Sequence, residues 1–441
     1  MTPSPSALAA SDPSSALPAG DWHVDEVLAR LRALAAPEVL REARIQPLAA
    51  CLGRVLAQPV VSPLDVPPHD NSAMDGYAFD GAALQTPAAA GGWQWRIVGT
   101  ALAGQPCTTP LAAGQALRIM TGAVMPPGAD TVVPQELCTR EGDTLRLQAS
   151  VGLRAGANRR RRGEDLSAGQ CALPAGTRLG PAALGLLASL GLTAVPVLRP
   201  LRVALFSTGD ELLEPGEPWR EGAIYDSNRF TLAGLLARLG CETTDLGRLA
   251  DRPEALESAL RRAALEADVI LTSGGVSQGD ADHLRTVLQR LGEIDFWRVA
   301  MRPGRPLAVG RLPKGASAQR GRALLFGLPG NPVAAMVSFL VFVRPTLLQL
   351  MGCRAQDCAP PPLVRARTLQ PIRKRPGRTE YPRGWLQARP GTLPEVQVSA
   401  DQGSGLLSGM QAANALVVLP HDQGQVQAGA EVDVLLIDAL V

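Results

Sequence analysis

The pattern of apolar and polar residues changes three times along the chain. Residues 22–36 place apolar side chains at helical spacing, and Pro37 ends this pattern, which predicts one amphipathic helix. From about residue 48 to residue 150, short apolar pieces alternate with turns rich in glycine and proline. Such a pattern is typical of a small β-rich domain.

The segment 151–195 predicts a second helix, from Pro181 to Leu190, which Gly191 terminates. We expect this segment to return and pack with the first helix. The β-rich domain at 48–150 is then an insertion within a discontinuous first domain.

From residue 200 onward, predicted strands and helices alternate. Continuous apolar strands such as "LRVALFS", "DVILT" and "ALLFGLP" are separated by helical patterns, and the last helix is expected at 332–350. This alternation predicts a doubly wound, mainly parallel α/β sheet. Sheets of this kind bind ligands at the carboxyl ends of their strands.

Beyond residue 362 the helical periodicity vanishes, and short strands such as "EVQVSA" and "EVDVLLI" indicate a separate β domain. The fold class is therefore multidomain α/β and β. The predicted parts are a disordered tail at 1–20, a discontinuous helix-and-linker domain at 21–47 plus 151–197, an inserted β-rich domain at 48–150, an αβα doubly wound domain at 198–352 and a C-terminal β-barrel-like domain at 360–441.

The charge balance gives no general reason to expect a polyanionic partner. The chain has 43 basic and 41 acidic residues, which leaves a formal net charge of +2. Neither nucleic acid nor an anionic membrane is indicated by this balance, so any anion site must be local. Only Lys314 and Lys374 are lysines. Arginine at a given position is therefore weak evidence that a guanidinium is required there.

The cysteines and histidines exclude several classes of site. The seven cysteines contain no C-x-x-C pair, and the four histidines show no H-x-x-x-H spacing. A disulfide framework, a zinc site and a histidine-centred triad are all disfavoured. The first 20 residues lack a basic start and a long apolar core, and the longest apolar run is shorter than the roughly 20 residues that a membrane span needs. We expect a cytoplasmic protein.

Three loops of the α/β domain should meet at one edge of its sheet: "FSTGDELLEPG", "TSGGVSQGDADH" and "FGLPGNP". None contains a Walker A sequence or a G-x-G-x-x-G after a strand, so a standard nucleotide site is not predicted. Small residues let a ligand approach the backbone, and Asn331 before Pro332 leaves amide donors free for an anion. The residues expected to bind substrate here are Ser273, Gly274, Gly275, Ser277, Gly330, Asn331 and Pro332.

Acidic residues lie in the same loops, where they should repel an anion. A divalent cation resolves this conflict, because Mg²⁺ binds one or two carboxylates together with phosphate oxygens. Asp280 or Asp282, with Asp210 or Glu211 from the neighbouring strand end, could supply those carboxylates. The alternative is that Asp280 caps the following helix and the other acids are solvated.

Two arginine-rich stretches remain open to more than one interpretation. Arg298, Arg302 and Arg305 surround a turn after a strand and could hold a second anionic group, although a solvated surface explains them equally well. The run "NRRRRGED" at 158–165 has no interleaved aromatic residue, so a contact within or between subunits is favoured over nucleic acid. The turn-rich segments 62–79 and 118–130 suggest a loop-built surface on the inserted domain.

Eight stretches, taken in order, resemble the molybdopterin molybdenumtransferase family, the MoeA type that also includes the gephyrin E domain. They are "SPLDVPPHDNSAMDGYAF", "IMTGAVMPPGADTVVPQE", "RRRGEDLSAGQ", "FSTGDELLEPG", "IYDSNRF", "SGGVSQGDADH", "FWRVAMRPGRPLAVG" and "GLPGNPVAAMVSF". The resemblance implies a head-to-tail homodimer of four-domain subunits. It also implies Mg²⁺-dependent cleavage of adenylylated molybdopterin, insertion of molybdate and release of AMP, with a molybdopterin adenylyltransferase and molybdoenzyme-maturation proteins as partners.

The resemblance assigns roles to particular residues. The implied catalytic residues are Asp75, Thr121, Asp165, Glu211, Asp251 and Asp282, and the implied substrate-binding residues include Pro329, Pro332, Arg383 and Ser404. In the dimer of such proteins, Asp75 and Thr121 are expected to face the partner's α/β domain. This chain departs from the family by having Arg298, Arg302 and Arg305 where lysines are common, which keeps the charge for phosphate or molybdate.

Other functions remain to be weighed. A molybdopterin adenylyltransferase uses a similar α/β domain, but the inserted and C-terminal domains disfavour that function. A non-catalytic scaffold of the gephyrin E-domain type is a different class of function. A nicotinamide dehydrogenase is disfavoured because the glycine pattern is missing.

Overall fold

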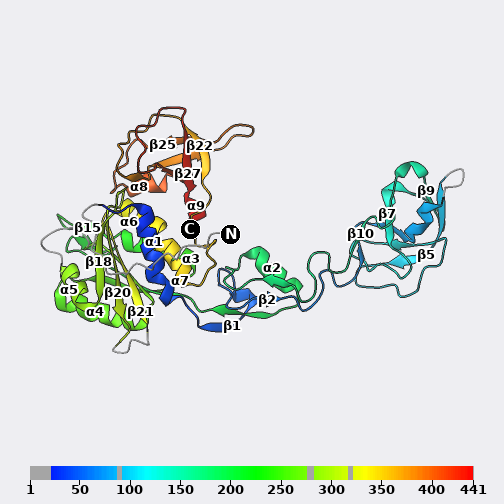
Figure 1. The fold of residues 1–441 in the computed structure, drawn as a ribbon, viewed down its shortest axis with the longest axis horizontal. Helices are drawn as coiled ribbons and strands as arrows, with labels where there is room; N and C mark the ends of the chain where they lie inside the picture. Colours follow the sequence, from blue (N-terminus) through cyan, green and yellow to red (C-terminus); the bar gives the residue numbers. More distant parts are fainter. Residues whose placement is uncertain (1–20, 87–91, 276–282, 316–320, 441) are drawn as a thin grey trace, which may run out of the picture. The chain divides into compact units, whose positions relative to one another are not determined.

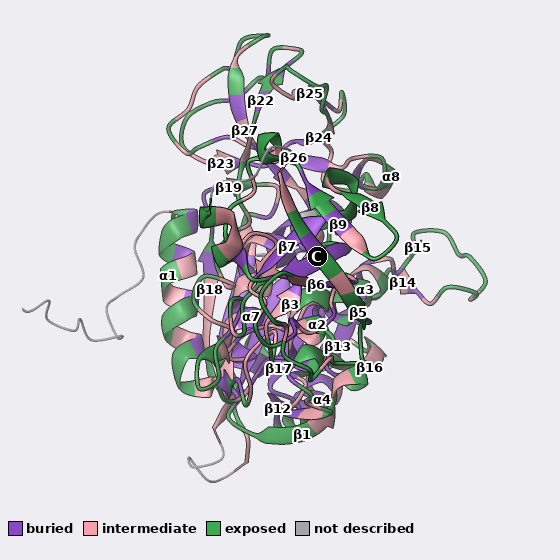
Figure 2. Cartoon of the chain, turned by 90° about the vertical axis from the view of Figure 1, so that its right-hand side faces the viewer, coloured by how far each residue is buried: buried purple, intermediate pink, exposed green. Residues whose placement is uncertain are grey.

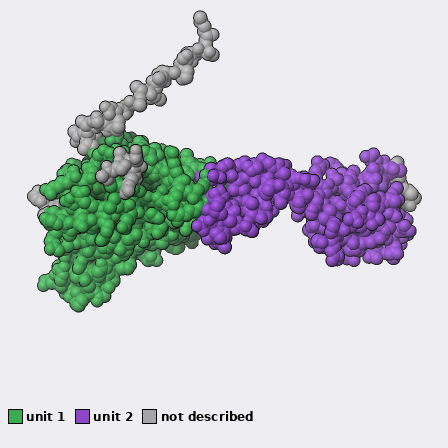
Figure 3. Space-filling model, turned by 90° about the horizontal axis from the view of Figure 1, so that it is seen from below, with its two compact units in different colours: residues 1–44, 53–57, 197–441 green, residues 45–52, 58–196 purple. Residues whose placement is uncertain are grey.

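The computed structural model describes residues 21–86, 92–275, 283–315 and 321–440. The chain forms two compact units (Figure 3). Unit 1 comprises residues 1–44, 53–57 and 197–441, and unit 2 comprises residues 45–52 and 58–196. Two paired strands, β1 (Ala43–Pro47) and β12 (Ala194–Leu198), each contain one of the boundaries between the units.

Unit 1 is built around a six-stranded sheet in the order β16-β13-β17-β21-β20-β18. The first four strands in that order run parallel, whereas β20 pairs antiparallel with both β21 and β18. The strands are β13 (Arg202–Thr208), β16 (Glu242–Leu249), β17 (Val269–Ser273), β18 (Glu293–Arg298), β20 (Pro306–Pro313) and β21 (Arg322–Leu328).

Helices cover both faces of this sheet (Figure 1). They are α1 (Val24–Ala35), α3 (Asn228–Leu239), α4 (Pro253–Glu266), α5 (His283–Leu291), α6 (Pro332–Ser338) and α7 (Arg344–Leu350). Alternate residues of β13 enter different cores, because successive strand side chains point to opposite faces. Leu205 packs in the core that contains residues of α1, α3, α6 and α7, whereas Phe206 packs in the core that contains residues of α4 and α5.

The pattern of burial follows this layered arrangement. Strand β17 is buried at all five of its positions. Helix α1 buries Val24, Val27, Leu31 and Ala35 and turns its exposed residues outward (Figure 2). The stretch Pro332–Leu350 is apolar and long enough to cross a membrane, but 72% of its most apolar window is buried inside the structure. Burial of this kind is typical of a core helix, and a π-helical turn at Phe339–Val343 interrupts it.

The C-terminal part of unit 1 is a closed barrel of five strands in the order β22-β25-β24-β26-β27. The short strand β19 (Met301–Arg302) pairs in parallel with β23 (Thr379–Glu380) and joins the α/β part to the barrel part. The other elements of unit 1 are β14 (Leu212–Leu213), β15 (Ile224–Tyr225), β22 (Val364–Thr368), β24 (Arg383–Gln387), β25 (Glu395–Val398), α8 (Leu407–Gln411), β26 (Ala415–Val418), β27 (Glu431–Leu436) and α9 (Ile437–Leu440).

Unit 2 contains a second six-stranded sheet, in the order β7-β4-β6-β5-β9-β8. Its strands are β4 (Gly76–Phe79), β5 (Trp93–Ala101), β6 (Gln115–Ile119), β7 (Thr131–Pro134), β8 (Thr139–Glu141) and β9 (Thr144–Leu147). The remaining elements are β2 (Val60–Val61), β3 (Asn71–Ser72), β10 (Arg159–Arg160), β11 (Cys171–Leu173) and α2 (Pro181–Ser189).

The predicted fold class is confirmed by the α/β sheet, the separate β-rich sheet and the closed C-terminal barrel. Helix α1 packs against α7 within unit 1. The four domains and their boundaries, including the pairing of 21–47 with 151–197, stay a prediction.

Candidate functional site

A cavity of about 1250 Å³ lies at the carboxyl ends of strands β13, β17 and β21 in unit 1. The barrel part contributes Arg378 and the loop 402–405 to its wall. The described parts of the three strand-end loops expected from the sequence therefore meet at one edge of the sheet. Of the predicted site residues, those that line the cavity are Asp210, Glu211, Asp251, Ser273, Gly274, Gly275, Arg302, Arg305, Pro329, Gly330, Asn331, Pro332 and Ser404.

Close approach of the backbones explains the glycines of the second loop. A Cβ on Gly274 would lie 2.6 Å from the carbonyl oxygen of Thr208, and both Gly274 and Gly275 have positive φ angles. Strand ends β13 and β17 can therefore meet at this distance only because position 274 has no side chain. The small residues noted in the sequence serve packing between loops as well as access for a ligand.

The carboxylates of Asp210 and Glu211 are exposed and line the cavity. Neither forms an ion pair with any residue in the described parts of the chain. The Glu211 carboxylate lies over Gly209, where a Cβ would be 2.6 Å from its Oε2 atom. Oxygen ligands of this kind suit Mg²⁺, which needs only one or two carboxylates besides phosphate and water.

The metal site itself stays a prediction. Within the described ranges there is no group of three or more histidine, cysteine, aspartate or glutamate residues that could hold a metal ion. Asp280 and Asp282, the other two predicted ligands, lie outside the described residues, as does Ser277. Asp210 and Glu211 are the two predicted ligands that the structure places at the cavity.

The three arginines of the predicted anion clamp differ in their surroundings. Arg298 and Arg305 both pair with Asp21, at 3.1 Å and 2.8 Å respectively. Arg302 lines the cavity and has no ion-pair partner among the residues that the structure describes. Arg305 also lines the cavity, whereas Arg298 does not. The structure therefore brings two of the three arginines to the site.

Arg383, predicted to bind substrate, is instead enclosed in the protein, with 1% of its surface exposed. Its guanidinium donates hydrogen bonds to the carbonyl oxygens of Asp401 and Gly403, at 2.9 Å and 3.1 Å. Burial lowers the pKa of Arg383 from its usual value. Since Ser404 follows these carbonyls and lines the cavity, Arg383 supports the cavity wall from behind.

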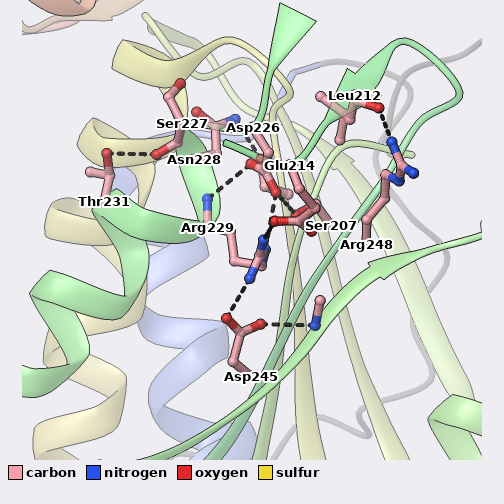
Figure 4. Close-up of polar contacts among 12 residues, drawn as sticks. Ser207, Leu212, Glu214, Asp226, Ser227, Asn228, Arg229, Thr231, Asp245 and Arg248 are labelled. Atoms are coloured by element: carbon pink, nitrogen blue, oxygen red, sulfur yellow. Dashed lines mark hydrogen bonds and ion pairs between the residues drawn. The ribbon is translucent and has the colours of Figure 1, made fainter. Parts of the chain in front are cut away.

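A charge network is centred on the buried side chain of Arg229 (Figure 4). Arg229 is 5% exposed and pairs with Asp226, Glu214 and Asp245. Asp226, which lines the cavity, also accepts a hydrogen bond from Ser207. Burial lowers the pKa of Arg229, but the three carboxylates outweigh this effect and raise it above its usual value. Arg229 therefore stays charged and fixes the segment that carries Asp226.

Sequence reasoning missed several residues of the cavity wall. Asp226 and Asn228 belong to the stretch "IYDSNRF", which carried the family resemblance but received no predicted role. Ser207, Arg378 and Gln402 also line the cavity. The signal for Asp226 and Asn228 was their position at the start of a helix in a strand-end segment, where polar side chains often face a ligand.

In unit 2 the structure brings together two of the three predicted catalytic residues. The Asp75 carboxylate accepts hydrogen bonds from the amide and the hydroxyl of Thr121, both at 2.7 Å. These two bonds lower the pKa of Asp75 from its usual value. Asp165 is exposed, and its backbone amide donates to the carbonyl oxygen of Val66 at 3.0 Å. No hydrogen bond joins Asp165 to Asp75 or Thr121 in the described parts of unit 2.

Comparison with known families accounts for most of the chain. Residues 22–191 match the MoeA N-terminal region (domain I and II), residues 204–349 match the probable molybdopterin binding domain, and residues 365–437 match the MoeA C-terminal region (domain IV). A molybdopterin molybdenumtransferase of Haemophilus influenzae is 40% identical over 86% of this chain and 90% of its own length. The chain belongs to the molybdopterin molybdenumtransferase family. The predicted family is thus confirmed.

Other members and a solved structure agree with this assignment. A molybdopterin molybdenumtransferase of Nostoc sp. is 37% identical over 90% of this chain and 89% of its own length. The crystal structure of a molybdopterin biosynthesis moeA protein from Pyrococcus horikoshii superposes with a TM-score of 0.77, at 27% identity, and covers 94% of this chain and 99% of that one. The chain is a transferase of molybdenum cofactor biosynthesis.

Proposed function

We propose that this chain inserts molybdate into adenylylated molybdopterin, with release of AMP, in a reaction that depends on Mg²⁺. The observation that carries this proposal is the cavity at the carboxyl edge of the sheet, which combines small-residue loops with carboxylates and a guanidinium that have no ion-pair partner among the described residues. Its volume of about 1250 Å³ exceeds the range of roughly 300–1,000 Å³ that is usual for small-molecule sites. A dinucleotide-like substrate needs such room.

Different residues of the cavity are proposed to bind different parts of this substrate. The amides of Gly330 and Asn331, which have no acceptor among the described residues, offer backbone donors to the diphosphate. Arg302 offers a fixed cation for a phosphate or for molybdate, which is doubly negative. Ile224 and Tyr225, which are 59% and 44% exposed, line the cavity and give an apolar surface on which a flat ring can lie.

Asp210 and Glu211 are the residues that would hold Mg²⁺, with Asp280 and Asp282 as further predicted ligands. An ion held there would offset the negative charge of the diphosphate and so favour cleavage of its phosphorus–oxygen bond. Without a cation, the two carboxylates oppose binding of the diphosphate, because like charges repel. The two carboxylates and the anionic substrate can therefore occupy the same site only when a cation lies between them.

The partners and the location follow from the same proposal. We expect a head-to-tail homodimer, in which Asp75 and Thr121 face the partner's α/β domain. We also expect a molybdopterin adenylyltransferase to supply the substrate and molybdoenzyme-maturation proteins to receive the product, in the cytoplasm.

Product analysis tests the proposal. The purified chain is incubated with adenylylated molybdopterin, Mg²⁺ and molybdate, and AMP is measured by chromatography. We expect AMP only when both molybdate and Mg²⁺ are present, and none after chelation by EDTA. If the chain instead forms the adenylylated compound from molybdopterin and ATP, it is an adenylyltransferase. If it releases no AMP but still binds partner proteins, the scaffold function replaces the proposal.

A further inference from the structure

Asn228, the first residue of helix α3, connects two of the loops that form the cavity. Its side-chain Nδ2 atom donates hydrogen bonds to Oγ of Ser273, at 2.6 Å, and to the carbonyl oxygen of Gly330, at 2.7 Å. The hydroxyl of Ser273 in turn donates to the carbonyl oxygen of Pro329, at 3.3 Å. Asn228 and Ser273 together therefore hold two successive carbonyl groups of the "GLPGNP" loop.

The direction of these carbonyls sets the direction of two amides. A trans peptide unit is planar, and its N–H points opposite to its C=O. Both peptide units concerned are trans, because the cis bonds of the described chain lie elsewhere. With the carbonyls of Pro329 and Gly330 held toward Asn228 and Ser273, the amides of Gly330 and Asn331 point the opposite way. Both of these residues are exposed and line the cavity.

The two amides are available to a ligand. No residue in the described ranges accepts a hydrogen bond from the amide of Gly330 or of Asn331. Two adjacent N–H groups that point the same way bind an oxyanion well, because several donors share one negative charge. Their direction depends on the hydrogen bonds that the carbonyls receive from behind.

Asn228 cannot serve the anion directly. A primary amide has two hydrogens, and both are used by Ser273 and Gly330. Its remaining Oδ1 atom is an acceptor, which a phosphate oxygen avoids, and it is buried without a partner among the described residues. The side chain, 8% exposed, thus acts on a ligand only through the loop that it holds.

We propose that Asn228 and Ser273 are a positioning pair that turns the amides of Gly330 and Asn331 into the cavity, where they bind the diphosphate of the substrate. This inference rests on the proposed function for the identity of the ligand. The arrangement of the loop does not depend on it, so the two can be tested separately.

The variant Asn228→Asp probes the pair with little change of shape. It replaces the donating nitrogen with an oxygen that repels the carbonyl of Gly330. We expect affinity for inorganic pyrophosphate in the presence of Mg²⁺, measured by calorimetry, to fall by about tenfold, because a buried donor is replaced by an unmatched acceptor. The KM for adenylylated molybdopterin should rise with it. Ser273→Ala removes only the relay to Pro329 and should weaken binding by about threefold.

The double variant shows whether the two residues act as a unit. Asn228→Asp combined with Ser273→Ala should weaken pyrophosphate binding by less than the product of the single effects, since both act on one loop. Thr231→Ala is the matched control. It lies on the same helix and loses one hydrogen bond, from its Oγ1 to the carbonyl oxygen of Ser227, but it does not line the cavity (Figure 4).

The outcomes separate this inference from the proposed function. The pair has no positioning role if folded Asn228→Asp and Ser273→Ala both bind pyrophosphate within twofold of the unaltered chain. The same conclusion holds if Thr231→Ala loses as much affinity as Asn228→Asp. If the unaltered chain releases no AMP while the charge-neutral Ser273→Ala still weakens pyrophosphate binding, the proposed function fails and the positioning pair stands.

Discussion

Acidic side chains at the two ends of the parallel strands in unit 1 differ in burial and in pairing. At the amino end of β17, Asp268 is 8% exposed and accepts hydrogen bonds from Arg199, from Lys314 and from the backbone amide of Arg202. At the carboxyl end, Asp210 and Glu211 are exposed to the cavity and have no ion-pair partner in the described residues.

The difference shows how to separate acids that serve the fold from acids that serve a ligand. The negative charge of Asp268 is neutralised by Arg199 and Lys314, so this carboxylate is not available to bind a metal or a substrate. The carboxylates of Asp210 and Glu211 remain solvated, so they carry no desolvation penalty. Their charge is available to a cation. The following substitutions test this difference through their effects on stability or activity, in decreasing order of expected size.

The largest effect is expected from removing the buried acid. Asp268→Ala leaves Arg199 and Lys314 without their shared partner in a site where both are largely buried. Breaking a buried ion pair on one side costs about 3–5 kcal/mol of unfolding free energy. Urea denaturation followed by circular dichroism should show this loss, whereas the folded fraction should keep its KM. An unchanged midpoint would show that the cluster is not what stabilises this end of the sheet.

The next effect concerns activity. Asp210→Asn combined with Glu211→Gln should lower kcat/KM for AMP release by about a hundredfold, which corresponds to roughly 2.7 kcal/mol. The unfolding free energy should change by less than about 0.5 kcal/mol, because surface side chains without partners contribute little. Glu257→Gln on helix α4 removes a half-buried carboxylate that does not line the cavity and is the control. Full activity of the double variant would remove both residues from the mechanism.

The contribution of Asp268 to stability should depend on pH. Burial alone would raise the pKa of Asp268, but hydrogen bonds from Arg199, Lys314 and Arg202 outweigh it and lower the pKa to about 2. A carboxylate whose pKa is lowered on folding stabilises the fold above its unfolded pKa, which is about 3.9. That contribution, roughly 2.5 kcal/mol, is lost as the pH falls from about 4 toward 2. Asp268→Asn should flatten this part of the stability profile, measured by urea titrations at each pH.

The smallest effect is expected at the exposed ion pairs of Asp21. Asp21→Asn removes contacts to Arg298 and Arg305, whose side chains are 51% and 55% exposed. Exposed pairs contribute about 0–1 kcal/mol, so the melting temperature should shift by no more than a few degrees. A shift as large as that of Asp268→Ala would mean that pairing, and not burial, decides the contribution of a charge in this protein.

Much of the fold could be predicted because the spacing of apolar residues along the sequence indicates which side of a helix or strand is buried. Strand β17 was visible as an apolar run, and α1 as an amphipathic pattern that ends at Pro37. The edge of the sheet that forms the cavity followed from the order of strands and helices. The confirmed fold class and family both rest on such local signals.

Residues whose role depends on partners far away in sequence could not be assigned in this way. Arg229 and Asp226 look like surface residues in the sequence, yet both are buried and pair with each other. Arg383 was expected at the substrate and is found behind the wall, because nothing in the sequence tells which face of the barrel a guanidinium reaches. Asn228 shows the same limit, since its two partners lie 45 and 102 residues away.

The apolar helix Pro332–Leu350 has a consequence for how the chain is made. As it leaves the ribosome, a stretch of this length and apolarity is prone to aggregate until it is buried. Strands β13, β17, β20 and β21, which supply its binding surface, are all synthesised before it. Because of this order, the strands against which the helix packs are already present when the helix emerges from the ribosome.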